Sequence, residues 1–148
     1  TTHDPQLWPM QARTGAARLA LATGAPVFPV AHWGDEQILG YVDEAGEDGR
    51  IKEKRKISLF PRKTVRVKVG KALDIASLVE DASPEAKHTR TELGVVTDAM
   101  LDAITAELEK IRGEKAPEGR WNPRTKRREA PGTPSGPVGG ALGEPDEK

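Results

Sequence analysis

The chain has 148 residues, a length that fits one domain, of which only 36% are hydrophobic and 4% aromatic, so its core must be modest. Its 23 Lys and Arg residues balance its 23 Asp and Glu residues, which excludes a strong overall attraction to nucleic acids or anionic membranes. The absence of cysteine excludes disulfides, cysteine-containing zinc sites and thiol nucleophiles, and it favours a reducing, cytoplasmic setting.

The first segments of the chain predict a loop followed by a helix. Prolines follow Asp4 and Trp8 and push these residues away from helical geometry, so residues 1–9 are predicted to form a loop. Apolar residues then recur at spacings of three and four over residues 10–23, which predicts a helix that ends at Gly24. Gly15 lies inside this predicted helix, where glycine costs about 1 kcal/mol relative to alanine. A close contact of the backbone with a neighbouring element or a ligand explains this glycine as well as tight helix packing does.

The middle of the chain predicts strands. Residues 26–33 are almost wholly apolar, which is typical of a buried strand covered on both faces. A short strand over residues 38–42 and an exposed acidic loop over residues 43–49 are expected next. In residues 63–71 valines alternate with basic residues, which predicts a strand with one buried face and one wet face.

A second helix and a tail are predicted to complete the fold. Ser83 and Pro84 are typical of a helix start, and an amphipathic stripe follows. We expect an α/β fold in which helices flank a mixed sheet, formed by residues 1–115. Residues 116–148 are rich in proline and glycine and are predicted to be a disordered tail, in which Trp121 is able to dock on the domain. The stripe consists of Thr97, Met100, Leu101, Ile104, Leu108 and Ile111.

Residues 52–71 carry nine Lys or Arg residues and one acid, Glu53, with Leu59, Phe60 and Pro61 at the centre. This segment suits an anionic lipid surface, to which each basic residue contributes about 1 kcal/mol. It equally suits the phosphates of an acyl thioester or phospholipid, or a solvated face. Few aromatic residues are present for base stacking and no nucleic-acid motif is found, so we expect no specific nucleic-acid partner.

Three histidines remain as candidate bases. His32 ends a predicted buried strand and is either a base, a ligand or a side chain bonded to backbone, whereas His3 and His88 are expected at the surface. The acids of residues 43–48 lack the spacing of a calcium loop, so no metal site is predicted. The longest apolar run, residues 25–31, holds two prolines and is far shorter than the roughly 20 residues that span a bilayer. No transmembrane segment is therefore expected.

Four segments resemble the 1-acyl-sn-glycerol-3-phosphate (lysophosphatidic acid) acyltransferases. R-T-G-A-A-R-L-A-L at residues 13–21 is similar to the helix that follows the family's glycerophosphate-binding loop, and A-P-V-F-P-V at residues 25–30 to its fourth block. L-F-P-R-K-T-V-R-V-K-V-G-K at residues 59–71 resembles its late hairpin strand. Residues 101–123 are similar to the closing helix and tail of bacterial members.

The resemblance implies phospholipid biosynthesis at the cytoplasmic side of the membrane, as a peripheral protein. An acyl group passes from acyl-CoA or acyl carrier protein to lysophosphatidic acid, giving phosphatidic acid. Arg13 and Gly15 fall on the family's basic residue and glycine, Thr1 on the threonine of its substrate-binding loop, and Pro29 on a strand-ending proline. The substrate-binding residues implied are Thr1, Arg13 and Gly15, and no cofactor beyond the acyl donor is expected.

The chain also departs from the family. The general base of the family is a histidine in H-x-x-x-x-D, and neither His3, His32 nor His88 has an aspartate at that spacing. The E-G-T-R-like motif is absent, and no initiator methionine precedes Thr1. We assign no catalytic residue and expect an inactive fragment whose catalytic histidine lies upstream of residue 1. The alternative is a noncatalytic module that binds anionic surfaces, lipid or nucleic acid, through residues 52–71.

Overall fold

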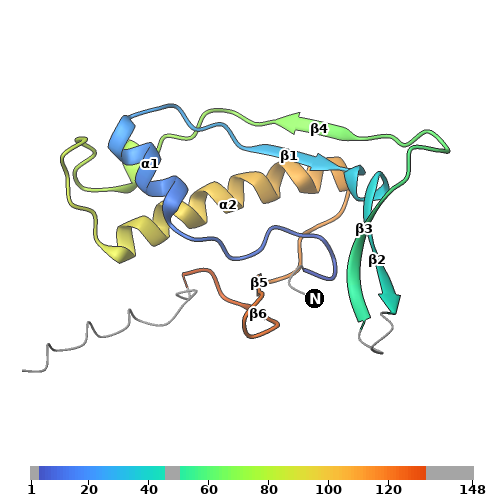
Figure 1. Ribbon diagram of the computed structural model, residues 1–148. Helices are drawn as coiled ribbons and strands as arrows, with labels where there is room; N and C mark the ends of the chain where they lie inside the picture. The colour runs from blue at the N-terminus through green and yellow to red at the C-terminus, as the bar shows by residue number, and fades with distance from the viewer. Residues whose placement is uncertain (1–3, 46–50, 133–148) are drawn as a thin grey trace, which may run out of the picture.

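The computed structural model describes residues 4–45 and 51–132. The long helix α2 is the spine of the molecule, with β1 and β4 along one side and the hairpin β5–β6 at another (Figure 1). This mixture of helices and strands confirms the predicted α/β class. The elements are α1 (Gly15–Thr23), β1 (Val30–Trp33), the 3₁₀ turn η1 (Asp35–Gln37), β2 (Leu39–Ala45), β3 (Ile51–Ile57), β4 (Arg66–Val69), η2 (Ala76–Leu78), α2 (Arg90–Arg112), β5 (Arg120–Asn122) and β6 (Arg127–Glu129).

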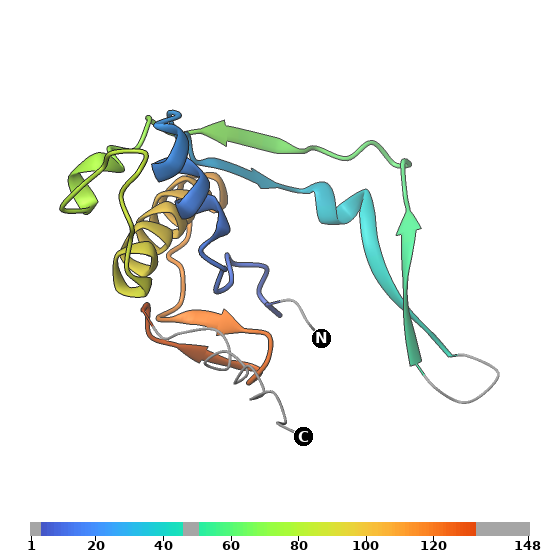
Figure 2. The ribbon, with the colours of Figure 1, turned by 60° about the vertical axis from the view of Figure 1, so that its left-hand side comes forward.

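The strands form three separate antiparallel pairs. β1 pairs with β4, β2 with β3, and β5 with β6, so the described residues form two-stranded sheets in place of the expected mixed sheet. Parallel pairing needs a long crossover, usually a helix. Here the hairpin β2–β3 connects β1 to β4 and brings the chain back antiparallel, and this hairpin extends away from α2 (Figure 2).

Helix α2 begins later than its sequence predicts. Ser83 and Ala86 form only a turn, closed by a 3.0 Å bond from the Ala86 amide to the Ser83 carbonyl. The helix starts after Thr89, whose hydroxyl accepts from the Glu92 amide (3.2 Å) while the Glu92 carboxylate accepts from the Thr89 amide (2.8 Å). This capping box satisfies two free amides. The hydrogen bonds from Thr89 also lower the pKa of Glu92.

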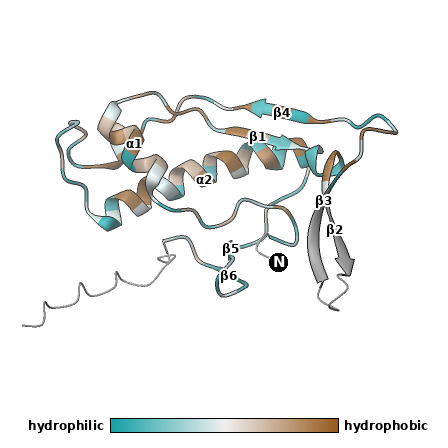
Figure 3. Ribbon diagram, in the orientation of Figure 1, coloured by the Kyte–Doolittle hydropathy of each residue, from teal (hydrophilic) through white to brown (hydrophobic). Residues whose placement is uncertain are grey.

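Two apolar clusters lie along α2, whose apolar and polar residues alternate (Figure 3). The first joins α1 to the N-terminal half of α2, and the second joins the N-terminal segment and β1 to its C-terminal half. The predicted amphipathic stripe is confirmed in part: Met100 and Leu108 lie in the clusters and Ile111 packs against the second. Leu93 and Val96, which the predicted stripe omits, are also buried in the first cluster. The buried residues are Ala17, Ala20, Leu21, Ile75, Leu93, Val96 and Met100 in the first cluster, and Trp8, Ala31 and Leu108 in the second.

Helix α1 begins at Gly15 and not at residue 10. The preceding segment is extended, and the Gln11 amide donates to the Trp121 carbonyl at 3.0 Å, which ties this segment to β5. A Cβ added to Gly15 would meet no heavy atom within 4 Å. Neither a close contact with a neighbouring element nor tight helix packing therefore explains this glycine, and contact of its backbone with a ligand stays a prediction. Gly24 ends α1 in the left-handed conformation, as predicted.

The pair β1–β4 buries the opposite face from the one expected. Val30 lies opposite Val69, and His32 opposite Val67, so these residues share one face. Val67 and Val69 are 63% and 60% exposed, whereas Ala31, on the other face, is 2% exposed. The predicted burial of the alternating valines was wrong, as was the prediction that residues 26–33 are covered on both faces. The reason is that α2 packs on one side only of this two-stranded sheet.

The hairpin β5–β6 falls within residues 116–148, which the sequence assigns to a tail. It is held by ion pairs: Arg120 bonds Asp98 and Asp102 of α2, and Arg128 Nη2 lies 2.8 and 2.7 Å from the two carboxylate oxygens of Asp4. Asp4 is only 2% exposed. The ordered structure thus continues past residue 115, and the predicted tail from residue 133 on lies outside the described residues.

Glu129 joins this hairpin to the N-terminal segment. Its carboxylate accepts hydrogen bonds from Asn122 (2.8 Å), Thr125 (2.6 Å) and Gln11 (3.1 Å). The bond from Asn122, followed by that from Thr125, lowers the pKa of Glu129. Since these partners favour the charged carboxylate, this contribution to folding is present above the ordinary glutamate pKa and is lost as pH falls through the lowered pKa.

Arg112, at the C-terminal end of α2, lies between two tryptophans. Its guanidinium carbon is 4.1 Å from the ring centroid of Trp8 and 4.1 Å from that of Trp33. Its Nη1 also donates to the Gln6 carbonyl at 2.8 Å. One side chain therefore joins the N-terminal segment, β1 and α2.

Replacing Arg128 with leucine should destabilise the fold by about 2–3 kcal/mol, because it leaves the buried Asp4 carboxylate without its cation. Urea unfolding followed by circular dichroism measures this loss. Arg127→Leu is the matched control, since the neighbouring Arg127 is exposed. Equal stability of the two variants would show that the Asp4 pair does not hold the hairpin.

Arg112→Met keeps the length of the side chain but removes the cation between the indole rings. We expect the free energy of unfolding to fall by about 1–2 kcal/mol. Because Trp8 and Trp33 are two of the three tryptophans, the native fluorescence spectrum should change as well. Arg124→Met, at an exposed arginine of the β5–β6 turn, is the control. A loss of stability no larger than that of the control would contradict a contribution from the stack.

Candidate functional site

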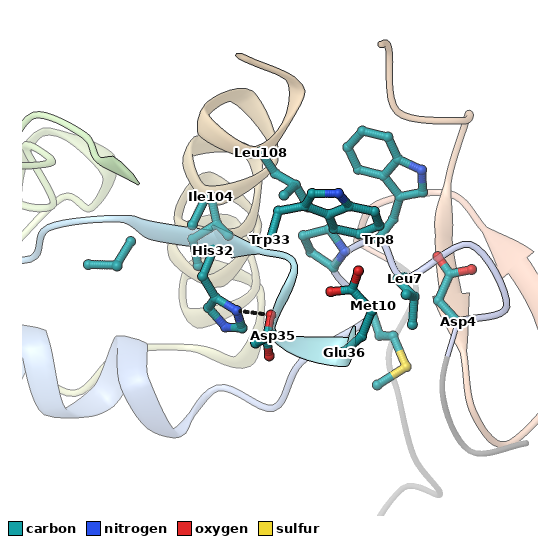
Figure 4. Close-up of a pocket in the computed structure, with 13 residues that line it drawn as sticks. Asp4, Leu7, Trp8, Met10, His32, Trp33, Asp35, Glu36, Ile104 and Leu108 are labelled. Carbon is teal, nitrogen blue, oxygen red and sulfur yellow. Dashed lines mark hydrogen bonds and ion pairs between the residues drawn. The ribbon is translucent and has the colours of Figure 1, made fainter. Parts of the chain in front are cut away.

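Two pockets and one basic surface are the candidate functional features. The first pocket, which we call the tryptophan pocket, has a volume of about 480 Å³ and lies between the N-terminal segment, β1 and α2 (Figure 4). Its walls are apolar and its rim is polar. Trp8, Met10, Ala31, Ile104 and Leu108 contribute to the walls, and Asp4, His32, Asp35 and Glu36 to the rim.

His32 and Asp35 meet at this rim. The η1 turn brings Asp35 back toward β1, so that its Oδ1 lies 2.8 Å from His32 Nδ1. A histidine oriented by a carboxylate is the arrangement of a general base. The two side chains are, however, 59% and 53% exposed, and no Ser, Thr or Cys is among the described residues that line the pocket. The pair therefore has neither a nucleophile beside it nor the water-poor surroundings that favour acyl transfer.

The second pocket, the arginine pocket, lies where α1 and α2 begin and has a volume of about 600 Å³. Arg13, Arg18, His88 and Arg90 line it, together with the apolar side chains of Leu93 and Val95. Arg13, Arg18 and Arg90 form no ion pair with any residue in the described part of the chain. Asp98, which also lines the pocket, is already paired with Arg120. The arrangement favours an anion that carries an apolar group.

The predicted substrate residues fare differently. Arg13 is exposed and lines the arginine pocket. Gly15 does not line it but follows Thr14, which does, at the start of α1. Thr1 lies outside the described residues. Pro29 is buried and lies directly before β1, so it does not end a strand as the resemblance implies; its carbonyl accepts from the Gly70 amide at 2.8 Å.

Sequence reasoning missed the partners of Arg13 and of His32. Arg18 and Arg90 reach the arginine pocket from two helices that are distant in sequence. No local sequence pattern predicts that these two side chains lie close together. Asp35 follows His32 by three residues, a spacing that fits a turn but not the family's H-x-x-x-x-D, so the sequence did not indicate that the two side chains pair. His88, expected at the surface, is half-buried in the wall of the arginine pocket.

The basic surface is formed by residues 56–71, the part of the basic segment whose side chains the structure describes. Lys68 bonds Glu107 at 3.7 Å, and this contact, after that of Lys110, helps to lower the pKa of Glu107. The other cations of this stretch form no ion pair with any described residue. They are Lys56, Arg62, Lys63, Arg66 and Lys71.

Over residues 4–45 and 51–132, no three acids or histidines gather in a way that would hold a metal ion. In the same part of the chain, neither helix combines the length and apolarity needed to cross a bilayer. Of the predicted acidic loop, residues 43–45 instead form the end of β2, and residues 46–49 lie outside the described residues.

Comparisons of the chain with models of protein families, with curated proteins and with solved structures found no match. The resemblance to lysophosphatidic acid acyltransferases therefore stays a prediction that the geometry of the two pockets and the basic surface must support.

Proposed function

We propose that this chain is a portion of a 1-acylglycerol-3-phosphate acyltransferase domain, in which it binds lysophosphatidic acid. One observation carries the proposal: Arg13, which falls on the family's basic residue, lines a pocket beside apolar side chains, where Arg13, Arg18 and Arg90 form no ion pair with any described residue. Lysophosphatidic acid combines a phosphate with one acyl chain. The arginine pocket offers complementary groups for both parts.

Charge favours the phosphate end of this ligand. Arg13, Arg18 and Arg90 can each form charge-assisted hydrogen bonds with phosphate oxygens, and such bonds are stronger than neutral ones. α1 begins here as well, and Thr14 makes no side-chain cap, so the positive end of this helix adds to the attraction. At the apolar end, Leu93 and the half-exposed Val95 can contact the beginning of the acyl chain.

The β1–β4 pair supports membership of a larger domain. A two-stranded sheet is marginal alone, and this one leaves Val30, Val67 and Val69 exposed on one face. We name these three residues the valine face. In the proposed domain, further parts of the acyltransferase cover the valine face and supply the H-x-x-x-x-D residues.

The proposed reaction requires a base that this chain does not supply. The base takes the proton of the acceptor hydroxyl, whose oxygen attacks the thioester carbonyl; a C–O bond forms, the C–S bond breaks and the thiol leaves with a proton. In this scheme Arg13 and its neighbours hold the acceptor by its phosphate. Acyl-CoA or acyl carrier protein is the acyl donor.

The chain should bind lysophosphatidic acid more tightly than monoacylglycerol, which lacks the phosphate. Arg13→Ala should weaken the binding of lysophosphatidic acid about tenfold, the loss of one charge-assisted hydrogen bond. Isothermal titration with lipid below its micellar concentration measures both. Arg127→Ala, on β6, is the control. Equal affinity for the two lipids, or an unchanged Arg13→Ala variant, would refute the proposed site.

The purified 148-residue chain should show no acyl transfer from acyl-CoA to lysophosphatidic acid, because it contains no H-x-x-x-x-D pair. Mass spectrometry of phosphatidic acid, together with release of free thiol, measures this. Turnover above the uncatalysed rate would contradict the proposal. Loss of that turnover in His32→Ala would then assign the base to the His32–Asp35 pair.

The alternative function is a noncatalytic module that binds anionic surfaces through the basic segment. The unpaired cations of residues 56–71 favour it. It predicts attraction to anionic lipid without any preference for lysophosphatidic acid in the arginine pocket, so the titration with Arg13→Ala separates it from the acyltransferase proposal.

A further inference from the structure

The connection between β3 and β4, residues 58–65, turns a corner far from α2 (Figure 2). We call it the Leu59–Phe60 corner after its two central apolar residues. Leu59 is 62% exposed and Phe60 84% exposed, and Ile57, at the end of β3, is 68% exposed. Three large apolar side chains thus face solvent within four residues, a concentration that marks an interaction site.

Cations flank these apolar side chains. Lys56 precedes them, Arg62 follows them, and both are exposed. Residues 56–71 contain no acid, and only Lys68 among the cations of this stretch is paired with a described residue. An exposed apolar group surrounded by free cations is complementary to the surface of an anionic bilayer, in which negative headgroups lie above an apolar interior.

Both ends of the corner are held in place by the turn that follows β1. The Ser58 amide donates to the Ile38 carbonyl at 2.8 Å. At the other end, a Cβ on Gly34 would lie 2.2 Å from the Thr64 carbonyl oxygen, so only glycine, here with φ of 101°, allows the two backbones to approach. The corner therefore presents Leu59 and Phe60 from a fixed base, which lowers the entropic cost of binding.

We propose that the Leu59–Phe60 corner inserts these two side chains into an anionic phospholipid bilayer while the neighbouring cations contact the headgroups. This inference deepens the alternative function, binding to anionic surfaces through the basic segment, and does not rest on acyl transfer. A nucleic acid suits the corner less well, since binding to single strands uses stacking on aromatic rings and Phe60 is the only ring here. Contact with phosphates would not stabilise the apolar side chains of Ile57 and Leu59, whereas burial in the hydrocarbon interior of a bilayer would.

Flotation of the 148-residue chain with vesicles tests the inference. The chain should bind vesicles of phosphatidylcholine and phosphatidylglycerol at low salt, and bind pure phosphatidylcholine weakly. The double variant Leu59→Ser, Phe60→Ser should lose about tenfold or more in partitioning. Leu19→Ser is the matched control, because Leu19 is 66% exposed on α1, and circular dichroism verifies that each variant keeps α2.

Insertion itself has a separate readout. The chain has no cysteine, so Phe60→Cys carries a polarity-sensitive fluorophore at one position. Its emission should shift to the blue with anionic vesicles and be quenched by brominated lipid, whereas the same label on Leu19→Cys should not respond. Vesicle binding that persists in the double serine variant, or a label at residue 60 that stays in water, would overturn the inference.

Charge reversal separates lipid from nucleic acid and from the acyltransferase proposal. Lys56→Glu with Arg62→Glu should abolish vesicle binding and leave the titration with lysophosphatidic acid unchanged. A chain that binds DNA through these two residues but does not bind anionic vesicles would overturn the lipid assignment. Loss of lysophosphatidic acid binding in Arg13→Ala, with vesicle binding intact, shows that the two surfaces act separately.

Discussion

The stack of Arg112 between Trp8 and Trp33 is the contact on which the arrangement of this molecule depends. The N-terminal segment has no regular hydrogen bonding of its own, and the guanidinium secures it to the end of α2 and to β1. Arg13 lies at the C-terminal end of this segment. Its position in the arginine pocket therefore depends on where the stack with Arg112 holds the segment. A planar cation suits this place because it stacks on two rings and still donates to a carbonyl.

Ion pairs extend what a small apolar core begins. With 36% hydrophobic residues, the chain fills two modest clusters along α2. The hairpin β5–β6 docks mainly through Arg120, through Arg128 and through the hydrogen bond from Gln11 to Glu129. A buried carboxylate such as Asp4 is tolerable only with its cation beside it. Such docking is specific in geometry, and it fixes the C-terminal hairpin against the N-terminal segment.

The two proposed lipid surfaces have a common logic. A lysophospholipid resides at a membrane, so a protein that binds its phosphate gains from holding itself there. The arginine pocket lies where α1 and α2 begin, whereas the Leu59–Phe60 corner lies between β3 and β4. In the proposals, the pocket recognises a headgroup and the corner contacts the bilayer. The valine face is a third surface, and its apolar character fits contact with protein within a larger domain.

Local patterns in the sequence determined much of the secondary structure. Three of these patterns involve only residues close in sequence: the apolar stripe of α2, the glycine that ends α1 and the alternation of residue types in β4. Each of them lies in an element that the structure contains. Tertiary structure alone decided that Val67 and Val69 face solvent, because periodicity tells which side chains share a face but not which face α2 covers. It also decided that Arg18 and Arg90 join Arg13, since two helices distant in sequence meet only when their apolar faces pack together.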